Sequence, residues 1–298
     1  MNIFITGAGG FIGGSIAAGL ARAGHHVRGL IRNPEHAAEL KRLGIEPVTG
    51  TLDDRNLLIA EAQAADAVIN AASSDHRGAV EALIEGLAGS GKPFLHTSGS
   101  SIVGDASGGE AGTAAIHHED ALPEPTADKA ARVAIDRLVL DAAQQHIRSA
   151  VLCNTLIYGN GVVAGSASVQ LPRLVRQAHK SGVVRHVGSG GNIWSNVHID
   201  DVVELYRLAL ENTPAGTFYF VESGEASFRD MSAAIAEVLK LGAPQNWPLA
   251  DAQQEWGYEM ASYGLGSNSR VRGERARKLL GWQPKHTSVI DWIKHEMV

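Results

Sequence analysis

A glycine-rich run that begins at the sixth residue constrains this chain more than any other feature. The segment Thr6-Gly7-Ala8-Gly9-Gly10-Phe11-Ile12-Gly13 lies between a short apolar run at residues 2–6 and a helical pattern at residues 11–23. A strand, a turn with glycines at this spacing and a helix form the element that holds a dinucleotide pyrophosphate at a helix N-terminus. Gly7 permits the tight turn, Gly10 lets backbone approach the phosphates, and Gly13 lets the helix pack on the sheet. An ordinary glycine turn is the alternative, and the flanking strand and helix argue against it.

Apolar strand patterns and helical patterns alternate after this turn. Strands are predicted at residues 26–31, 46–49, 67–70, 93–97 and 149–153, with helical patterns between them, and a later strand at residues 217–221. Such alternation predicts an α/β protein with a Rossmann-type, doubly wound parallel sheet. The strands are continuous apolar runs, as expected when helices cover both faces of the sheet.

The pattern becomes less regular after about residue 158. Helices are predicted there at residues 168–177, 202–210, 228–240 and 272–280. We therefore expect residues 1–158 to form an NAD(P)-binding Rossmann domain, whose sheet also takes the strand near 217–221. Residues 159–298 would form mainly a smaller C-terminal substrate lobe, because ligands of such sheets bind at the carboxyl ends of the strands.

Composition limits the classes of partner. The formal net charge of the 298 residues is −6, so no global basic field attracts nucleic acid or an anionic membrane. No apolar stretch approaches the roughly 20 residues of a membrane helix. The single cysteine, Cys153, permits no intrachain disulfide and fits a reducing compartment. We expect a cytoplasmic protein, a monomer or homodimer, that takes a small-molecule substrate and neither nucleic acid nor membrane.

Thirteen histidines raise the question of a metal site. The adjacent pairs His25-His26 and His117-His118 lack the i, i+4 spacing of a helical zinc site, so no metal is expected. His198, followed by Asp200 and Asp201, is more typical of a helix N-cap than of a catalytic pair.

The end of the second predicted strand bears on the choice of dinucleotide. An acidic residue there would hold the ribose 2′-hydroxyl of NAD, whereas this chain has Arg32 followed by Asn33. The planar guanidinium of Arg32 suits a 2′-phosphate. The sequence therefore favours NADP over NAD, with a solvated surface arginine as the alternative.

Further segments carry a family resemblance. They occur in one order along nearly the whole chain: Asn70-Ala71-Ala72, Thr97-Ser98-Gly99, Leu156-Ile157-Tyr158-Gly159, Val197-His198-Ile199-Asp200-Asp201-Val202 and Ala276-Arg277-Lys278-Leu279-Leu280-Gly281-Trp282-Gln283-Pro284. With the glycine-rich run, they resemble the short-chain dehydrogenase/reductase superfamily, and within it the extended and atypical branches known as NAD-dependent epimerase/dehydratase.

The resemblance implies a set of cofactor contacts. Gly7, Gly10, Phe11, Ile12 and Gly13 would hold the pyrophosphate. Arg32 and Asn33 would lie at the adenosine ribose, and Leu52 would lie by the adenine. Ala71, Ala72 and Ser73 would line the cofactor, and Thr97 and Ser98 would approach the nicotinamide ribose. Asn154 follows the sixth strand and is expected near the nicotinamide end.

The catalytic pattern of the family is altered in this chain. Typical members use a Ser or Thr and a Tyr-x-x-x-Lys pair, whose tyrosine is the general acid or base. The serine position falls on Gly99, between Ser98 and Ser100, and no tyrosine precedes Tyr158. Alignment of the next helix places Arg132 at the lysine position and Asp128 at the tyrosine position.

These substitutions leave the proton donor open. Arg132 would bind the ribose and supply a fixed positive charge, but an arginine does not deprotonate and cannot donate the proton. Ser98, Ser100 and Asp128 are the candidates for that role, and Lys129 is an alternative to Arg132 if the helix register differs. A solvated helix face is the plain alternative for both basic residues.

Two functions remain open from the sequence. The first is an NADP(H)-dependent oxidoreductase or epimerase-like enzyme that acts on a small carbonyl, hydroxyl or nucleotide-sugar substrate, with NAD as the second choice of cofactor. The second is a dinucleotide-binding regulator or redox sensor without turnover. The altered catalytic pattern favours the regulator, and a C-terminal lobe over the cofactor favours the enzyme.

Overall fold

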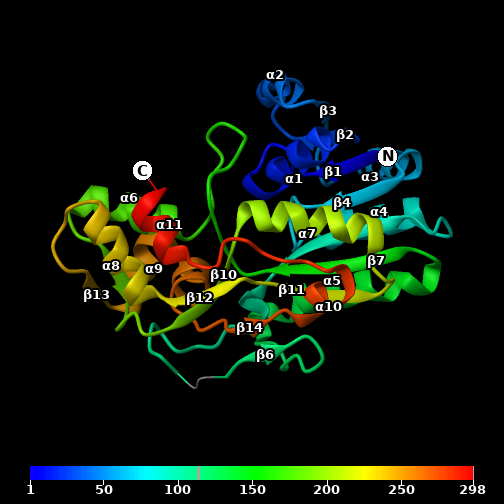
Figure 1. The fold of residues 1–298 in the computed structure, drawn as a ribbon. Coiled ribbons are helices and arrows are strands. Elements are labelled where there is room, and N and C mark those ends of the chain that lie inside the picture. The colour runs from blue at the N-terminus through cyan, green and yellow to red at the C-terminus, as the bar shows by residue number, and fades with distance from the viewer. Residues whose placement is uncertain (113–114, 298) are drawn as a thin grey trace.

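A seven-stranded parallel sheet forms the centre of the molecule in the computed structural model, which describes residues 1–112 and 115–297 (Figure 1). The strand order is β11-β7-β5-β4-β1-β2-β3, and every neighbouring pair is parallel. This is the predicted Rossmann-type architecture. The strands are β1 (Asn2–Thr6), β2 (His26–Ile31), β3 (Ile45–Thr49), β4 (Ala67–Asn70), β5 (Pro93–Gly99), β7 (Arg148–Asn154) and β11 (Thr217–Val221).

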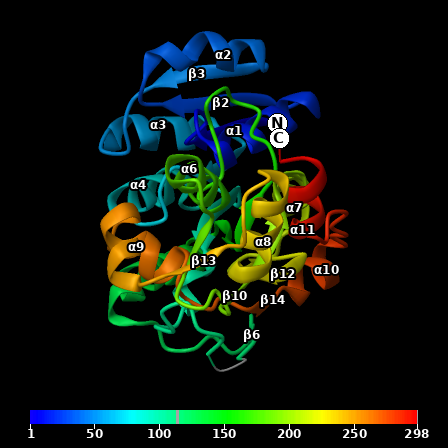
Figure 2. The ribbon, with the colours of Figure 1, turned by 90° about the vertical axis from the view of Figure 1, so that its left-hand side faces the viewer.

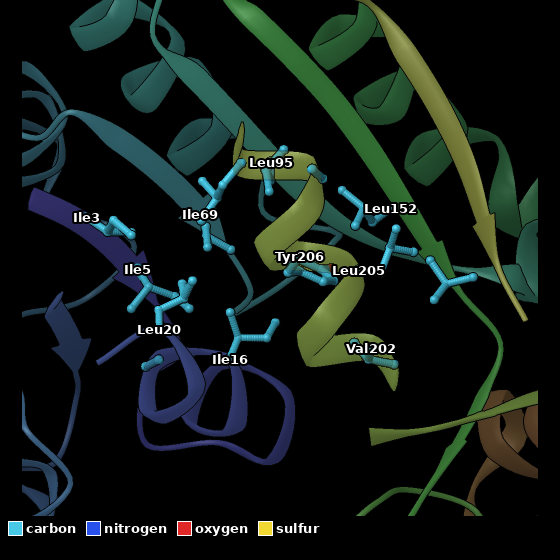
Figure 3. Packing of buried hydrophobic residues seen from close by; sticks show 14 of the residues in the cluster. Ile3, Ile5, Ile16, Leu20, Ile69, Leu95, Leu152, Val202, Leu205 and Tyr206 are labelled. Carbon is cyan, nitrogen blue, oxygen red and sulfur yellow. The ribbon is translucent and has the colours of Figure 1, made fainter. Parts of the chain in front are cut away.

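Helices cover both faces of this sheet. On one face α1 (Phe11–Arg22), α2 (Ala37–Arg42), α7 (Ile199–Asn212) and α10 (Glu274–Leu280) share an apolar core with the strands. Figure 3 shows side chains of β1, β4, β5 and β7 meeting those of α1 and α7 in this core. The other face is covered by α3 (Arg55–Ala64), α4 (Arg77–Leu87) and α5 (Ala130–Asp141). Burial on both faces explains why the strands read as continuous apolar runs.

A smaller lobe lies at the carboxyl ends of the strands, where β7 passes almost directly into β8 (Leu156–Tyr158) (Figures 1 and 2). Its three-stranded sheet has the order β12-β10-β8, from β10 (Ile193–His198) and β12 (Gly224–Ser227), and a further strand pair joins β9 (Arg185–Val187) to β13 (Gln245–Trp247). The helices of the lobe are α6 (Leu171–Ser181), α8 (Phe228–Val238), α9 (Leu249–Trp256), a π-helix (Met260–Gly264) and α11 (Val289–His295). The lobe has its own apolar core.

The chain crosses between these two parts more than once. β11 comes from beyond residue 158 and lies beside β7 at the edge of the main sheet. A short pair, β6 (His117–His118) with β14 (Val271–Arg272), links the segment after β5 to the C-terminal region. The division of the chain at residue 158 therefore stays a prediction. No helix in the described ranges has the length and apolarity needed to cross a membrane.

Asp201 ties the C-terminal segment to α7. Its buried carboxylate accepts hydrogen bonds from the backbone N–H groups of Lys285 (2.8 Å) and His286 (2.9 Å), and its carbonyl accepts the indole N–H of Trp282 (3.0 Å). The two carboxylate bonds fix the segment that leads to α11, so Asp201 has a structural role.

We predict that Asp201→Ala lowers the free energy of unfolding by about 2 kcal/mol, because two partly buried N–H groups lose a charged acceptor. Denaturant titration measures the change. The matched control is Asp200→Ala, whose side chain is 72% exposed and should change the stability by less than about 0.5 kcal/mol. Equal effects of the two substitutions would contradict the assignment.

Candidate functional site

A cleft at the carboxyl ends of the central strands consists of two adjoining compartments. The first compartment, about 570 Å³, lies between the glycine-rich turn and the segments that follow β2, β3 and β4. The second compartment, about 350 Å³, lies between the start of α1, the ends of β5 and β7, and residues 167–170 before α6. Gly10, Ala71 and Ala72 line both compartments, so the two lie side by side.

The turn between β1 and α1 leaves its backbone open to a ligand. Gly10 is the N-cap of α1 and has no side chain to cap it, and the first helical turn carries no acidic residue. Gly7 has φ +74°, and a Cβ on it would lie 2.8 Å from the Ala71 carbonyl oxygen. A Cβ on Gly13 would lie 2.4 Å from the Gly7 carbonyl oxygen. Free N–H groups and an uncompensated helix dipole suit the pyrophosphate of a dinucleotide.

The first compartment contains most of the predicted adenosine contacts. Arg32, Asn33, Leu52 and Ser73 all line it, and His36 joins Arg32 as a second basic side chain. Arg32 forms no ion pair with any residue in the described ranges, so its guanidinium is free to meet an anion. The Asn33 side chain is engaged locally, because it caps the short helix at Pro34–His36 by accepting the Glu35 N–H at 3.0 Å.

The second compartment receives only part of the predicted nicotinamide set. Of that set, Ser98 and Asn154 line it. Phe11, Ile12 and Gly13, which were predicted to hold the pyrophosphate, line it too. Thr97 does not, because successive side chains of β5 point to opposite faces of the sheet. Its hydroxyl lies 2.7 Å from the Tyr206 hydroxyl, under α7.

Arg132 lies near Gly99, which lines the second compartment. Its Nε and Nη2 donate to the two Asp75 carboxylate oxygens at 2.8 and 2.5 Å, and its Nη1 donates to Ser101 Oγ at 2.9 Å. The guanidinium holds the pKa of Asp75 below its ordinary value. Nη1 also lies 3.8 Å from where a Cβ on Gly99 would sit, at the edge of the second compartment.

The other predicted catalytic residues have different surroundings. Ser100 is fully buried, and its hydroxyl lies 2.8 Å from that of Ser269, away from the cleft lining. Asp128 is exposed and accepts hydrogen bonds from the hydroxyls of Tyr258 (3.2 Å) and Tyr263 (2.9 Å). These tyrosines stand more than a hundred residues away in the sequence, so no local signal marked them.

Lys129 is held apart from the cleft. The side chain is almost fully buried, forms an ion pair with Glu259 and lies 4.3 Å from the ring centroid of Tyr263. The helix register thus brings Arg132, rather than Lys129, to Ser101 and Gly99.

A buried polar network runs beneath the second compartment. The Thr6 hydroxyl donates to Asn70 Oδ1 at 2.6 Å, and Asn70 Nδ2 lies 3.0 Å from His96 Nδ1. His96 Nε2 and Asp136 Oδ1 are 3.7 Å apart and neither has a hydrogen-bond partner among the described residues. Asp136 Oδ2 accepts the Ser98 hydroxyl at 2.8 Å.

Burial shifts the two titratable groups of this network in opposite directions. Desolvation raises the pKa of Asp136 to about 7, against the Ser98 hydrogen bond and the Arg132 charge. Desolvation lowers the pKa of His96 to about 4. Asp136 stands four residues after Arg132 on the same helix, but nothing in the sequence connects it to Ser98.

One group of His and Asp side chains in the described part of the chain has ligand atoms within 4.8 Å of one another: His198, Asp200 and His286. His198 Nδ1 accepts the Asp200 N–H at 3.2 Å as the N-cap of α7, as its sequence context predicts. His286 Nδ1 lies 3.0 Å from an Asp201 carboxylate oxygen. These contacts account for the cluster, which lies outside the two compartments.

Comparison with known proteins identifies the family to which this chain is similar. Residues 3–221 match the model of the NAD dependent epimerase/dehydratase family. The oxidase ucsJ of Acremonium sp is 32% identical over 95% of this chain and 92% of its own. A 2-alkyl-3-oxoalkanoate reductase of Stenotrophomonas maltophilia is 28% identical over 76% of this chain and 71% of its own. A solved UDP-glucose 4-epimerase of Thermotoga maritima with UDP-glucose has the same fold, with a TM-score of 0.79 and 17% identity over 99% of this chain and 96% of its own.

The opposite pKa shifts predict opposite pH dependences of stability. His96 binds its proton more weakly when folded, so its contribution to stability decreases as pH falls from about 6.5 to about 4. Asp136 binds its proton more tightly when folded, so its contribution decreases as pH rises from about 4 to about 7. The two slopes, each about 1.4 kcal/mol per pH unit, oppose each other in the overlapping range.

We therefore expect Asp136→Asn to make the free energy of unfolding rise more steeply with pH between about 4 and 6.5 than in the wild type. His96→Asn should make it fall more steeply with pH over the same range. Urea titrations at a series of pH values give both slopes. The control is Asp141→Asn, an exposed carboxyl at the end of the same helix. Parallel slopes in all four proteins would refute the assigned shifts.

Proposed function

The chain belongs to the NAD-dependent epimerase/dehydratase family, and from that membership we propose that it is an NADP(H)-dependent oxidoreductase of a small carbonyl compound or its alcohol. The observation that carries the proposal is that the two compartments adjoin and share lining residues. An open phosphate-binding turn leads, through Gly10, Ala71 and Ala72, into a second compartment at the ends of β5 and β7. A dinucleotide bound along this cleft would bring its reactive end next to a pocket for substrate.

This chain's own residues would hold the cofactor along the cleft. The N–H groups at the start of α1 would bind the pyrophosphate, and Leu52, Ala71, Ala72 and Ser73 would form the wall around adenosine and ribose. Arg132, fixed by Asp75, would present a permanent positive charge to the nicotinamide ribose. When bound, the nicotinamide supplies hydride to a carbonyl carbon or accepts it from an alcohol.

Arg32 supports NADP(H) rather than NAD(H). Its guanidinium lines the first compartment without an ion-pair partner in the described ranges, and His36 lies beside it in the lining. A 2′-phosphate would give both basic groups an anion, with the bidentate geometry that a guanidinium favours.

The second compartment supports a small uncharged substrate. Of the described residues that line it, none is charged, and Ser98, Asn154, Ser168 and Gln170 supply hydroxyl and amide groups. The diphosphate of a nucleotide sugar would need arginine or lysine side chains at this end. The reductase and the oxidase among the relatives are named for redox chemistry, which fits the same reading.

The function is tested by turnover. A panel of ketones, among them the 3-oxo ester ethyl acetoacetate, an aromatic ketone and a quinone, is offered with NADPH alongside UDP-glucose with NAD. We expect NADPH consumption with at least one carbonyl compound, because the compartment's hydroxyl and amide groups suit a neutral carbonyl, and no change of UDP-glucose. Saturable NADPH binding without any turnover would instead favour the regulator.

The cofactor is tested by binding. We predict that Arg32→Ala weakens NADPH binding roughly tenfold or more and leaves NADH binding within about twofold, because only NADPH carries the 2′-phosphate. Fluorescence titration of the reduced dinucleotides measures both constants. Arg42→Ala removes an arginine of α2 whose side chain is 75% exposed, and it serves as the control for net charge. Equal losses in the two variants, or equal affinity of the wild type for both dinucleotides, would exclude a 2′-phosphate site at Arg32.

A further inference from the structure

The proposed reaction requires a proton that the cofactor does not provide. Reduction of a carbonyl places a hydride on carbon and a proton on oxygen, and the family's tyrosine position is occupied here by Asp128. Asp128 is exposed and already accepts two tyrosine hydroxyls, Ser100 faces Ser269 in the interior, and Arg132 stays charged. The acid must therefore be sought among groups that reach the second compartment by another route.

Ser98 provides such a route. Ser98 is one of the residues that line the second compartment, and its hydroxyl lies 2.8 Å from Asp136 Oδ2, whose carboxyl is buried under the sheet. From this geometry we infer that Ser98 and Asp136 form the proton-transfer pair of the enzyme, with Ser98 in contact with the substrate oxygen and Asp136 acting through it. The inference rests on the proposed function and assigns its proton donor.

The hydrogen bond between the pair suits transfer in either direction. Ionised Asp136 accepts the Ser98 hydroxyl, whereas protonated Asp136 donates to Ser98 Oγ and frees the Ser98 hydrogen to point into the compartment. The second carboxyl oxygen, Oδ1, faces His96 Nε2 at 3.7 Å and has no partner among the described residues. His96 Nδ1 faces the Asn70 amide, which leaves the proton of neutral His96 on Nε2, toward the carboxyl.

Four groups surround the Asp136 carboxyl electrostatically. Arg132 of α5 favours its ionised form, Asp75 of the β4–α4 segment opposes ionisation, and His96 of β5 is neutral. Cys153 of β7 is fully buried and pairs with Ser98 in the register of β5 and β7, and it keeps its thiol proton because burial raises its pKa. Desolvation exceeds these charge effects and sets the pKa of Asp136 to about 7. That value suits a general acid at neutral pH.

The transfer balances with the hydride. As the carbonyl carbon gains a C–H bond, the electron pair of the C=O π bond moves to oxygen. The oxygen takes the Ser98 hydroxyl proton, and Ser98 takes the proton of Asp136, which becomes a carboxylate. After the alcohol leaves, water in the compartment returns a proton to Asp136 through Ser98. Oxidation of the alcohol follows the same path in reverse.

The first experiment observes the carboxyl directly in the protein without substrate. Infrared spectra recorded from about pH 5 to about pH 9 should contain a protonated carboxyl band that disappears with a midpoint of about 7. The band should be absent from Asp136→Asn and shifted in Ser98→Ala, which lacks the hydrogen-bond partner. A carboxyl band that is unchanged in either variant would contradict the assignment of the band to Asp136 hydrogen-bonded to Ser98.

The second experiment uses NADPH and a carbonyl compound of the panel that the wild type reduces. For the wild type we expect kcat/KM to fall about tenfold per pH unit above the pKa of Asp136, since reduction needs the protonated carboxyl. Asp136→Asn and Ser98→Ala should lower kcat roughly 100-fold or more with NADPH affinity unchanged, and Asp136→Asn should lose the break in the pH profile. Asp141→Asn, an exposed acid at the end of the same helix, should match the wild type.

The outcomes separate the two proposals. A wild type that binds NADPH but reduces no carbonyl compound of the panel contradicts the proposed function, and the infrared band still tests the coupling of Ser98 and Asp136 by itself. An active wild type whose pH profile and rate survive in Asp136→Asn contradicts the pair alone.

Discussion

The whole site depends on the hydroxyl of Thr6, the last residue of β1. It donates to Asn70 Oδ1 at 2.6 Å and accepts the backbone N–H groups of Ala71 (3.1 Å) and Ala72 (3.2 Å). Thr6 pairs with Asn70 in the parallel register of β1 and β4, so the three bonds close the gap between two strands just as both turn away from the sheet. Gly7 then passes so near Ala71 that a Cβ would not fit. Both compartments are built on the two segments that this hydroxyl joins.

The same hydroxyl begins a line of polar groups that continues under the sheet. The side-chain amide of Asn70 contacts His96 Nδ1 on β5, and the other ring nitrogen of His96 faces the Asp136 carboxyl on α5. An apolar interior makes each ionised form costly, which keeps His96 neutral and lets Asp136 keep its proton to about pH 7. Buried polar networks of this kind are stable only where most donors find acceptors. Among the described residues, His96 Nε2 and Asp136 Oδ1 have no hydrogen-bond partner and form a gap in this line. The gap coincides with the carboxyl to which we assign proton transfer.

The elements that the sequence predicts correctly are those marked by a pattern of neighbouring residues. The glycine turn and strands β1 to β5 were predictable because each is a short apolar run beside its own turn residues. β10 was not predicted as a strand, because buried Ser195 and Asn196 interrupt its apolar character. Thr97 and Ser98 were expected to face the cofactor together, but the alternation of a strand sends Thr97 to Tyr206 and Ser98 to Asp136. Contacts between residues far apart in sequence, such as those of Asp128 with Tyr258 and Tyr263, leave no pattern that a single chain reveals.

Arg132, which we predict to stand at the family's lysine position, changes what the neighbouring acid can do. A lone guanidinium near Asp136 would favour its carboxylate and so remove the proton that the reaction needs. Asp75 forms two bonds to that guanidinium and opposes its effect, so the charge next to the network is largely balanced. Desolvation then decides the protonation of Asp136, and the permanent charge of Arg132 remains near Gly99 of the second compartment. Asp75, which no sequence motif singled out, is thus the residue that lets a fixed cation and a neutral acid occupy successive turns of α5.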